Sequence, residues 1–272
     1  MARVPPNTHA TAHALPVFTD TRSVQLVPAD VRERVRSVMD GFSRQTADAI
    51  VLMSVIRYRV LTERLPEAND RGVRQLVILG AGLDTTAFAL PAWGNDWRVF
   101  EVDHPATQDW KRAQIANVGW RTPPNLVFAP CDFETQDLLS ALDAAGFDRM
   151  RPAVVSLFGV IVYLTLDATR TTLRQLAGLA AQSEVTISYC PPLDGTDSVA
   201  METRRKASPT VDATGESFIG DYRESELESL VREAGFSDVI HHPLTMLNAR
   251  YFNGRPDRLR LHPIEQLLTA VV

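Results

Sequence analysis

The central motif of this chain is Leu76-Val77-Ile78-Leu79-Gly80-Ala81-Gly82-Leu83-Asp84-Thr85. Its apolar half predicts a buried strand, and its glycines predict a turn where backbone can approach a ligand with no Cβ in the way. A dinucleotide-binding turn has the form G-x-G-x-x-G, whereas Thr85 stands at the third glycine position here. Asp84 would also bring a negative charge toward a pyrophosphate. The turn therefore favours a ligand without phosphates.

The chain beyond this motif alternates between short apolar runs and helical patterns, which is typical of a parallel sheet with crossover helices. The pattern predicts strands over residues 75–79, 98–102, 126–129, 153–158 and 185–189. It predicts helices over residues 85–90, 106–118, 135–145, 167–180 and 224–234, and closing strands near residues 239–241 and 246–252. These elements predict an α/β fold with a Rossmann-like, doubly wound, mostly parallel sheet.

The first 70 residues differ from the rest, and we expect residues 1–70 to form a helical cap segment ahead of a core over residues 71–272. Asp30, with Glu33 three positions later, predicts a helix start of the capping-box type. The apolar residues that follow, Val31, Val35, Val38, Met39 and Phe42, have helical spacing. A second helix is expected to end near Pro66.

The stretch over residues 191–217 has no clear periodicity. A connection of that length inside a compact domain is usually functional or disordered. We therefore expect it to act as a lid or substrate loop of the core.

Two acidic residues follow the strands on one side of the glycine turn. Asp103 ends the second strand about 20 residues beyond the glycines, where a carboxylate can hydrogen-bond both ribose hydroxyls. Asp132 follows the third strand, where it can accept the amino group of adenine while Phe133 packs on the purine. Capping of the next helix is the alternative for Asp103, and a helix cap or a turn is the alternative for Asp132. With the glycines, this pattern predicts an adenosine ligand and suits S-adenosylmethionine better than NAD.

The composition restricts the partners and the location. The chain has 272 residues with 28 Lys and Arg against 33 Asp and Glu, a net charge of −5, whereas binding to nucleic acid usually leaves a basic surplus. No apolar run reaches the roughly 20 residues of a membrane-spanning helix, and residues 1–16 lack the apolar run of a signal peptide. The two cysteines, Cys131 and Cys190, make neither a disulfide framework nor a metal cluster. We therefore expect a cytoplasmic protein without a metal, a nucleic-acid partner or a membrane partner.

Six motifs, the central one among them, carry a resemblance: QLVILGAGLDTTAFAL at 75–90, VFEVDHPATQDWKRAQI at 99–115, PCDF at 130–133, GVIVYLT at 159–165, REAGF at 232–236 and RYFNGRPDRLR at 250–260. Together they resemble the leucine carboxyl methyltransferase family. The similarity extends over residues 57–260 and is strongest to the bacterial branch of S-adenosylmethionine-dependent O-methyltransferases that includes polyketide-tailoring enzymes. The resemblance implies a class I methyltransferase fold with an N-terminal helical cap and S-adenosylmethionine as the cofactor.

The family motifs also imply roles for individual residues. By position, Gly80, Ala81 and Gly82 line the methionine end of the cofactor, Asp103 binds the ribose, and the pair at 132 and 133 binds the adenine.

The family has an arginine upstream of the glycine turn that binds the cofactor carboxylate. Arg57 is the best match and Arg59 is its competitor. A solvated helix face is the alternative for both residues.

Phe158 occupies a cofactor-binding position but departs from the family pattern, in which a glutamate commonly stands before the glycine at the end of the fourth strand. A phenyl ring cannot accept a hydrogen bond from the cofactor's ammonium group. Another group takes that role, or the cofactor binds more weakly, or the site is reshaped for an apolar substrate.

The sequence thus predicts a methyltransferase that acts on an oxygen of a small, partly apolar metabolite, such as a polyketide-type secondary metabolite. C-methylation, an NAD-dependent oxidoreductase and a non-catalytic nucleoside-binding protein are the alternatives. A carboxylate acceptor needs no general base, whereas a phenol or enol benefits from one. His104, Tyr163, His241 and His242 are interpreted as structural, so no catalytic residue is named.

Overall fold

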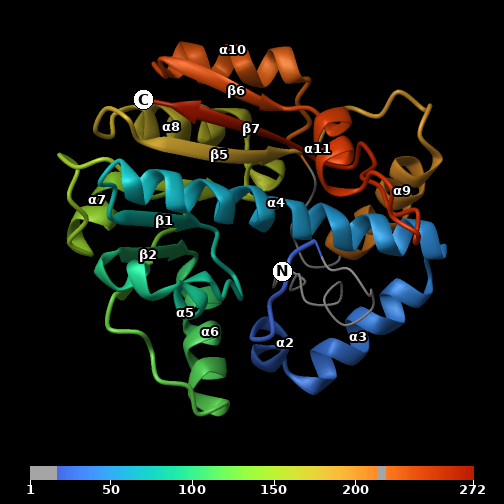
Figure 1. Ribbon diagram of the computed structural model, residues 1–272, viewed down its shortest axis with the longest axis horizontal. Coiled ribbons are helices and arrows are strands. Elements are labelled where there is room, and N and C mark those ends of the chain that lie inside the picture. The colour runs from blue at the N-terminus through green and yellow to red at the C-terminus, as the bar shows by residue number, and fades with distance from the viewer. Residues whose placement is uncertain (1–16, 213–218) are drawn as a thin grey trace.

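A computed structural model describes residues 17–212 and 219–272, so the expectations for residues 1–16 lie outside the described chain. The fold is built on a seven-stranded sheet with the order β3-β2-β1-β4-β5-β7-β6 (Figure 1). The strands are β1 (Gln75–Leu79), β2 (Arg98–Asp103), β3 (Leu126–Pro130), β4 (Val154–Leu157), β5 (Glu184–Tyr189), β6 (Asp238–His242) and β7 (Gln266–Val271). Strand β7 runs antiparallel to both of its neighbours, and the other pairs are parallel. The predicted Rossmann-like, mostly parallel sheet is confirmed.

Strand β1 is buried along its whole length because it lies in the middle of the sheet and is covered on both faces. Leu76 and Ile78 belong to the apolar cluster on one face, and Val77 and Leu79 to the cluster on the other. Because successive side chains of a strand point to opposite faces of the sheet, this one apolar run contributes to both hydrophobic clusters.

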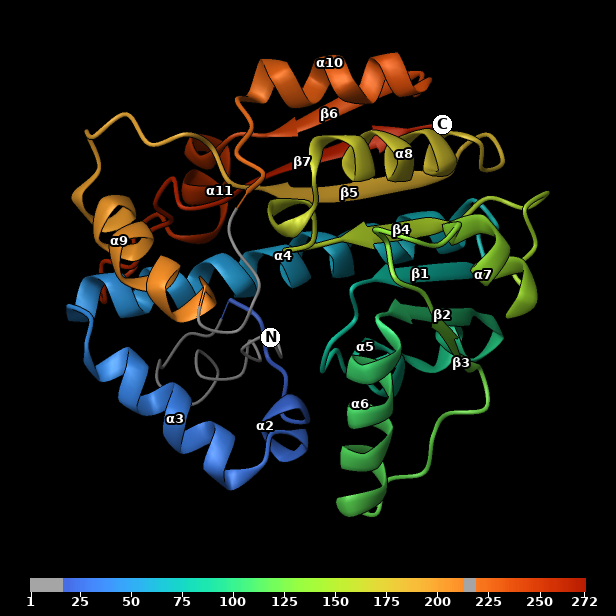
Figure 2. The ribbon, with the colours of Figure 1, turned by 180° about the vertical axis from the view of Figure 1, so that it is seen from behind.

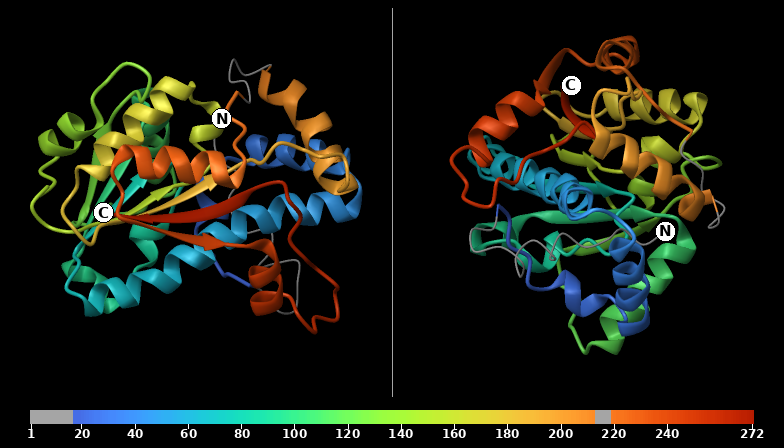
Figure 3. Two further views of the ribbon diagram at one scale, coloured as in Figure 1. Left: turned by 90° about the horizontal axis from the view of Figure 1, so that it is seen from above. Right: turned by 90° about the vertical axis from the view of Figure 1, so that its right-hand side faces the viewer.

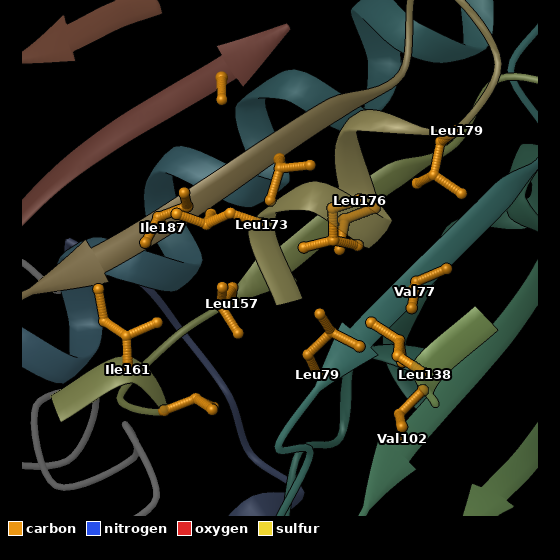
Figure 4. Packing of buried hydrophobic residues seen from close by; sticks show 14 of the residues in the cluster. Val77, Leu79, Val102, Leu138, Leu157, Ile161, Leu173, Leu176, Leu179 and Ile187 are labelled. Atoms are coloured by element: carbon orange, nitrogen blue, oxygen red, sulfur yellow. The ribbon is translucent and has the colours of Figure 1, made fainter. Parts of the chain in front are cut away.

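Helices cover both faces of the sheet (Figures 1 and 2). One face holds α4 (Arg44–Asp70), α5 (Thr86–Ala89), the 3-10 helix η1 (Ala92–Asp96) and α6 (Pro105–Asn117). The other holds α7 (Leu138–Ala144), the 3-10 helix η2 (Ile161–Tyr163), α8 (Leu166–Ala177) and α10 (Glu224–Ala234). Figure 4 shows Leu173 and Leu176 of α8 packed toward Leu157 and Ile187 of the sheet. This apolar burial, about 1.5–3 kcal/mol for each such side chain, is what holds the helices on the sheet.

Helix α4 is longer than the sequence predicts. The Ser43 side chain accepts a hydrogen bond from the Thr46 N–H at its start, and the helix continues through the exposed Pro66 to Asp70. The prediction that it ends near Pro66 is wrong, because the apolar face continues to Leu65 and Ala68 and their burial outweighs the lost hydrogen bond. The N-terminal half of α4 extends beyond the strand ends, as Figures 1 and 3 show.

Two smaller helices precede α4: α2 (Ser23–Leu26) and α3 (Ala29–Asp40). The predicted capping box is wrong, because α3 starts one residue before Asp30, whose carboxylate pairs with Arg34 at 3.1 Å. None of the twelve residues of α3, all of them described, is buried. Val38 is 43% exposed. Helical spacing was correct, but spacing does not say whether another element covers the face.

The C-terminal region also differs from the prediction. Residues 246–252 were expected as a strand, whereas α11 (Leu244–Tyr251) is a helix that buries Leu247. Short apolar runs do not separate strand from helix by themselves. The closing strand is instead β7, which the sequence analysis did not identify and which pairs with both β5 and β6.

The segment after β5 contains α9 (Ser198–Asp212), where only an aperiodic connection was expected. Glu202 of α9 accepts hydrogen bonds from Ser43 Oγ at 2.8 Å and from Thr46 Oγ1 at 2.5 Å, so α9 docks on the start of α4. The part of the expected lid over residues 213–217 lies outside the described chain. Within residues 17–212 and 219–272, no helix is both long and apolar enough to cross a membrane.

Candidate active site

The glycine turn follows the buried strand β1 at the centre of the sheet. Gly80 has φ +61° and Gly82 has φ +51°, a left-handed conformation that favours glycine. The N–H of Ala81, between them, donates to the carbonyl of Val102 at 3.2 Å. The turn is therefore held against the end of β2, and no side chain projects from either glycine.

Asp103 lies over this turn. Its Oδ2 accepts the N–H of Gly82 at 2.5 Å, and its Oδ1 accepts the N–H of His104 at 2.7 Å. The alternative role as cap of α6 is not observed, because the His104 ring accepts the Ala106 N–H at 3.3 Å instead. The structure thus joins Gly82 and Asp103, which lie 21 residues apart.

A buried ion pair supports the turn from below. Lys111 of α6 and Glu101 of β2 are each 1% exposed and are bonded to each other, and the Lys111 amine also donates to the Asp84 carbonyl at 2.6 Å. Burial raises the pKa of Glu101 to about 7, and Lys111 opposes that rise. Asp84 turns its own carboxylate to the N–H of Thr86 at 2.7 Å. Sequence reasoning missed this pair, since Glu101 and Lys111 lie within helix and strand patterns and their contact depends on how α6 packs.

Asp132 and Phe133 follow β3, next to β2 in the sheet. Asp132 accepts the N–H of Glu134 at 3.0 Å and the hydroxyl of Thr135 at 2.9 Å, which holds the pKa of its carboxyl below the usual value. Phe133 is half-buried against the core. Both residues reach the same edge of the sheet as Asp103, and the local turn that was the alternative for Asp132 is present.

Arg57, rather than Arg59, lies at the strand ends. A Cβ placed on Gly159, just after β4, would lie 3.0 Å from Arg57 Nη1. Arg57 is 8% exposed and forms an ion pair with Glu265, directly before β7. Arg59 points to another part of the molecule, where it pairs with Glu63 at 2.8 Å and lies over the ring of Tyr251. Glu265 was missed because 208 residues separate it from Arg57.

Phe158 is 1% exposed and packs into the apolar cluster beneath α4. Its ring meets Tyr58 edge to face at 6.2 Å, and Tyr58 stacks on Phe18 at 5.9 Å. Phe158 therefore extends an aromatic wall rather than offering a hydrogen-bond acceptor.

A cavity of about 260 Å³ lies beside this wall and the loop after the glycine turn. Its lining is mostly apolar and comes from three segments: Phe18, Thr19 and Asp20; Tyr58, Thr62, Leu65 and Pro66 of α4; and Leu83, Asp84, Thr85, Thr86, Ala89, Leu90, Pro91 and Trp93. Asp20 accepts the hydroxyl of Thr85 at 2.8 Å, and Thr62 donates to the carbonyl of Arg59 at 3.1 Å. Because these polar groups already have partners, the cavity favours an apolar guest.

The histidines interpreted as structural have structural partners. His241 Nε2 lies 3.1 Å from Glu228 of α10, and His242 Nε2 lies 2.8 Å from Thr269 Oγ1 of β7. A histidine not singled out from sequence, His262, is 6% exposed, and its Nδ1 lies 2.9 Å from Asp197. That contact ties the start of α9 to the segment before β7.

Solved structures share this fold. One is the S-adenosylmethionine-dependent methyltransferase SibL, with a TM-score of 0.55 and 17% identity over 90% of this chain and 59% of that chain. Another is a DUF574 family protein from Streptomyces avermitilis, with a TM-score of 0.58 and 16% identity over 89% of this chain and 90% of the other. The fold is that of class I methyltransferases.

The sequence relatives define the class further. One from Mycolicibacterium paratuberculosis, named "Putative S-adenosyl-L-methionine-dependent methyltransferase", is 32% identical over 247 residues, 87% of this chain and 74% of the relative. One of the same description from Bacillus subtilis is 32% identical over 192 residues, 69% of this chain and 62% of the relative. The family model for leucine carboxyl methyltransferase matches residues 7–177. The protein is an S-adenosylmethionine-dependent methyltransferase. It belongs to the leucine carboxyl methyltransferase family, which sets aside the NAD-dependent oxidoreductase.

The strand ends fit this cofactor. The glycine turn leaves backbone open to a ligand, Asp103 offers carboxylate oxygens beside it, and Arg57 lies against Gly159 on the neighbouring strand end. S-adenosylmethionine, when bound, supplies an electrophilic methyl group on a sulfonium. The protein therefore has to align the acceptor with this methyl group and exclude water, more than it has to activate either reactant.

Replacing Lys111 tests the support of the turn. Lys111→Met leaves Glu101 buried without its cation, which we expect to lower the free energy of unfolding by about 3–5 kcal/mol. In this variant the pKa of Glu101 lies still further above its unfolded value. The stability that depends on the protonated carboxyl is therefore present at low pH and is lost as pH rises past 7. Urea denaturation should show a larger loss of unfolding free energy at pH 8 than at pH 5. Adding Glu101→Gln to this variant should restore part of the lost stability. Lys206→Met, which removes a more exposed pair, should cost below about 1 kcal/mol.

Replacing Asp103 tests the ribose role. Asp103→Ala removes charge-assisted hydrogen bonds of about 1.5–3 kcal/mol each, so the affinity for S-adenosylhomocysteine should fall at least about tenfold in calorimetry. Asp137→Ala is the matched control, because Asp137 caps α7 and its loss should lower stability without changing affinity. Normal affinity in Asp103→Ala with a much lower melting temperature would make Asp103 a structural residue.

Proposed function

We propose that this methyltransferase acts on an oxygen, carboxyl or hydroxyl, of a small and partly apolar metabolite such as a polyketide-type secondary metabolite. The observation that carries the proposal is the apolar cavity beside the cofactor turn. An apolar cavity of roughly 150 Å³ holds benzene, so a cavity of this size suits a guest of about two rings. The name of the family supports a carboxyl oxygen as the acceptor. The two unpaired cysteines support a cytoplasmic location.

The roles of the site residues form part of this proposal. Gly80, Ala81 and Gly82 line the methionine end of the cofactor, and Asp103 binds the ribose. Arg57 binds the cofactor carboxylate. The adenine lies against Asp132 and Phe133, next along the same edge.

The chain has two elements placed to cover this edge of the sheet. The N-terminal half of α4, within the 1–70 cap, extends past the strand ends, and α9, within the 191–217 segment, docks on it (Figure 2). Hydrogen bonds from Lys206, Thr46 and Ser43 lower the pKa of Glu202 to about 2, so the contact between the two helices keeps its charge near neutral pH. We propose that these helices exclude water from the transfer step.

The transfer itself makes few demands on side chains. A carboxylate acceptor is already nucleophilic, so alignment and water exclusion suffice. A phenol would need to lose a proton, and we assign no base to that step.

The acceptor chemistry can be measured with methyl-labelled S-adenosylmethionine and a panel of two-ring carboxylic acids and phenols. We expect label in the organic product, and mild alkali should release it as methanol from a methyl ester but not from a methyl ether. A labelled methyl group attached to a carbon of the acceptor, rather than to an oxygen, would indicate C-methylation. A chain that binds S-adenosylhomocysteine but labels no acceptor in the panel would favour a non-catalytic binding protein.

Filling the cavity tests its role. Ala89 is exposed and lines the cavity, so Ala89→Trp should place an indole in its mouth and raise the KM for the acceptor at least about tenfold, by loss of apolar contact. Ala92→Trp is the matched control, since Ala92 is exposed nearby but does not line the cavity. Equal kinetics in the two variants would remove the cavity from the acceptor site.

A further inference from the structure

The ion pair between Arg57 and Glu265 is buried at both ends. The Arg57 side chain is 9% exposed and the Glu265 side chain 4%, and Nε and Nη2 of the guanidinium both contact one oxygen, Oε2. Taking two charges out of water costs about as much as their attraction returns, so such a pair adds little net stability. A pair of this kind calls for an explanation other than stability.

The pair lies at the switch point of the sheet, where the strand order reverses between β1 and β4. Strand β4 pairs with β1 so that Leu157 lies opposite Leu79, and Phe158 and Gly80 are the next residues on these strands. Arg57 Nη1 approaches Gly159, whose φ of +56° favours glycine and whose Cβ, if it had one, would lie 3.0 Å from that nitrogen. The pair therefore lies at the same edge as the glycine turn.

A buried thiol and further charged side chains lie near this pair. The pKa of Cys190, which follows β5, is raised to about 12, mainly by burial, and Glu265, Arg57 and Arg204 also act on it. Arg204 of α9 is held by Asp221 at 2.7 Å. Arg57 and Glu265 thus face the ends of β4 and β5 from α4 and from the segment before β7.

The amino-acid end of S-adenosylmethionine carries a carboxylate and an ammonium on one carbon. A guanidinium and a carboxylate side by side are complementary to such a zwitterion, since each can exchange its partner without leaving a buried charge unpaired. Phe158, at the adjoining strand end, presents only an apolar ring. Building on the role proposed for Arg57, we propose that Glu265 binds the ammonium group of the cofactor while Arg57 binds its carboxylate.

This assignment makes Glu265 a cofactor-binding residue supplied from the C-terminal part of the chain. The acid reaches the site because β7 is antiparallel to β5, with Gln266 opposite Tyr189. The residue before β7 therefore lies at the edge where the parallel strands end. An acidic partner for the ammonium is then present although position 158 is apolar.

The test compares three ligands by calorimetry. S-adenosylhomocysteine has the whole zwitterion, its decarboxylated form S-adenosyl-3-thiopropylamine keeps the ammonium alone, and 5′-methylthioadenosine has neither charge. Glu265→Gln should lower the affinity for the first two by about 10–100-fold, the loss of one charge-assisted hydrogen bond, and leave the third unchanged. Glu265→Asp, which keeps the charge, should recover part of the loss.

Glu184→Gln is the matched control. Glu184 is also buried and also pairs with arginines, Arg64 of α4 and Arg71 directly after it, but it lies at the opposite end of β5. Its replacement should change the melting temperature without changing the ratio of affinities for S-adenosylhomocysteine and 5′-methylthioadenosine.

Three results would overturn the assignment. Unchanged affinities for all three ligands in Glu265→Gln would remove Glu265 from the site, and an equal loss for all three ligands in both Glu265 variants would make the pair structural. A loss for S-adenosylhomocysteine alone would show that Glu265 acts by orienting Arg57 toward the carboxylate. A wild-type chain that binds none of the ligands would contradict the cofactor site itself, which is a different outcome from these three.

Discussion

The parallel pairing of β1 with β4, Leu79 opposite Leu157, is the constraint on which the site depends. Because both strands run in the same direction, the turns after them open at one edge of the sheet, and the strand order reverses there. Strand β1 itself is wholly buried and offers no side chain to a ligand. The chemistry has to come from the residues just beyond the strands and from elements that pass over this edge.

Helix α4 is the element that passes over it. Apolar side chains such as Leu52, Val55 and Leu61 hold the helix on the sheet, at about 1.5–3 kcal/mol each, whereas its buried ion pairs are close to neutral in free energy. Its arginines nevertheless reach both ends of the sheet: Arg64 pairs with Glu184 at the start of β5, and Arg57 pairs with Glu265 near the strand ends. Apolar packing sets the position of the helix. That position decides which arginine lies at the glycine-turn edge of the sheet and which lies at the opposite edge.

The same helix bounds the cavity. Helix α5 has only four residues and is followed by the short η1, so space is left between them and α4. The rings of Phe18, Tyr58 and Phe158 continue this apolar surface to the end of β4. The apolar wall proposed for the acceptor and the polar edge proposed for the cofactor thus share one loop, and the Lys111 amine holds that loop through the Asp84 carbonyl.

The strand-turn-helix units, the parallel sheet and the acidic residues at the ends of β2 and β3 could be predicted from the sequence, because these are local patterns of period and turn chemistry. The family could be predicted too, through motifs whose residues are close together in the chain. The sequence did not predict the helix α11, the absence of buried residues in α3, or the insertion of β7 between β5 and β6, because each depends on which surface covers an apolar run. The contacts of Arg57 with Glu265 and of Lys111 with Glu101 under the glycine turn became evident from the packing of the folded chain. The local sequence does not indicate which residue a charged side chain will pair with. A buried charge needs a partner, and which charges are buried depends on how the chain packs.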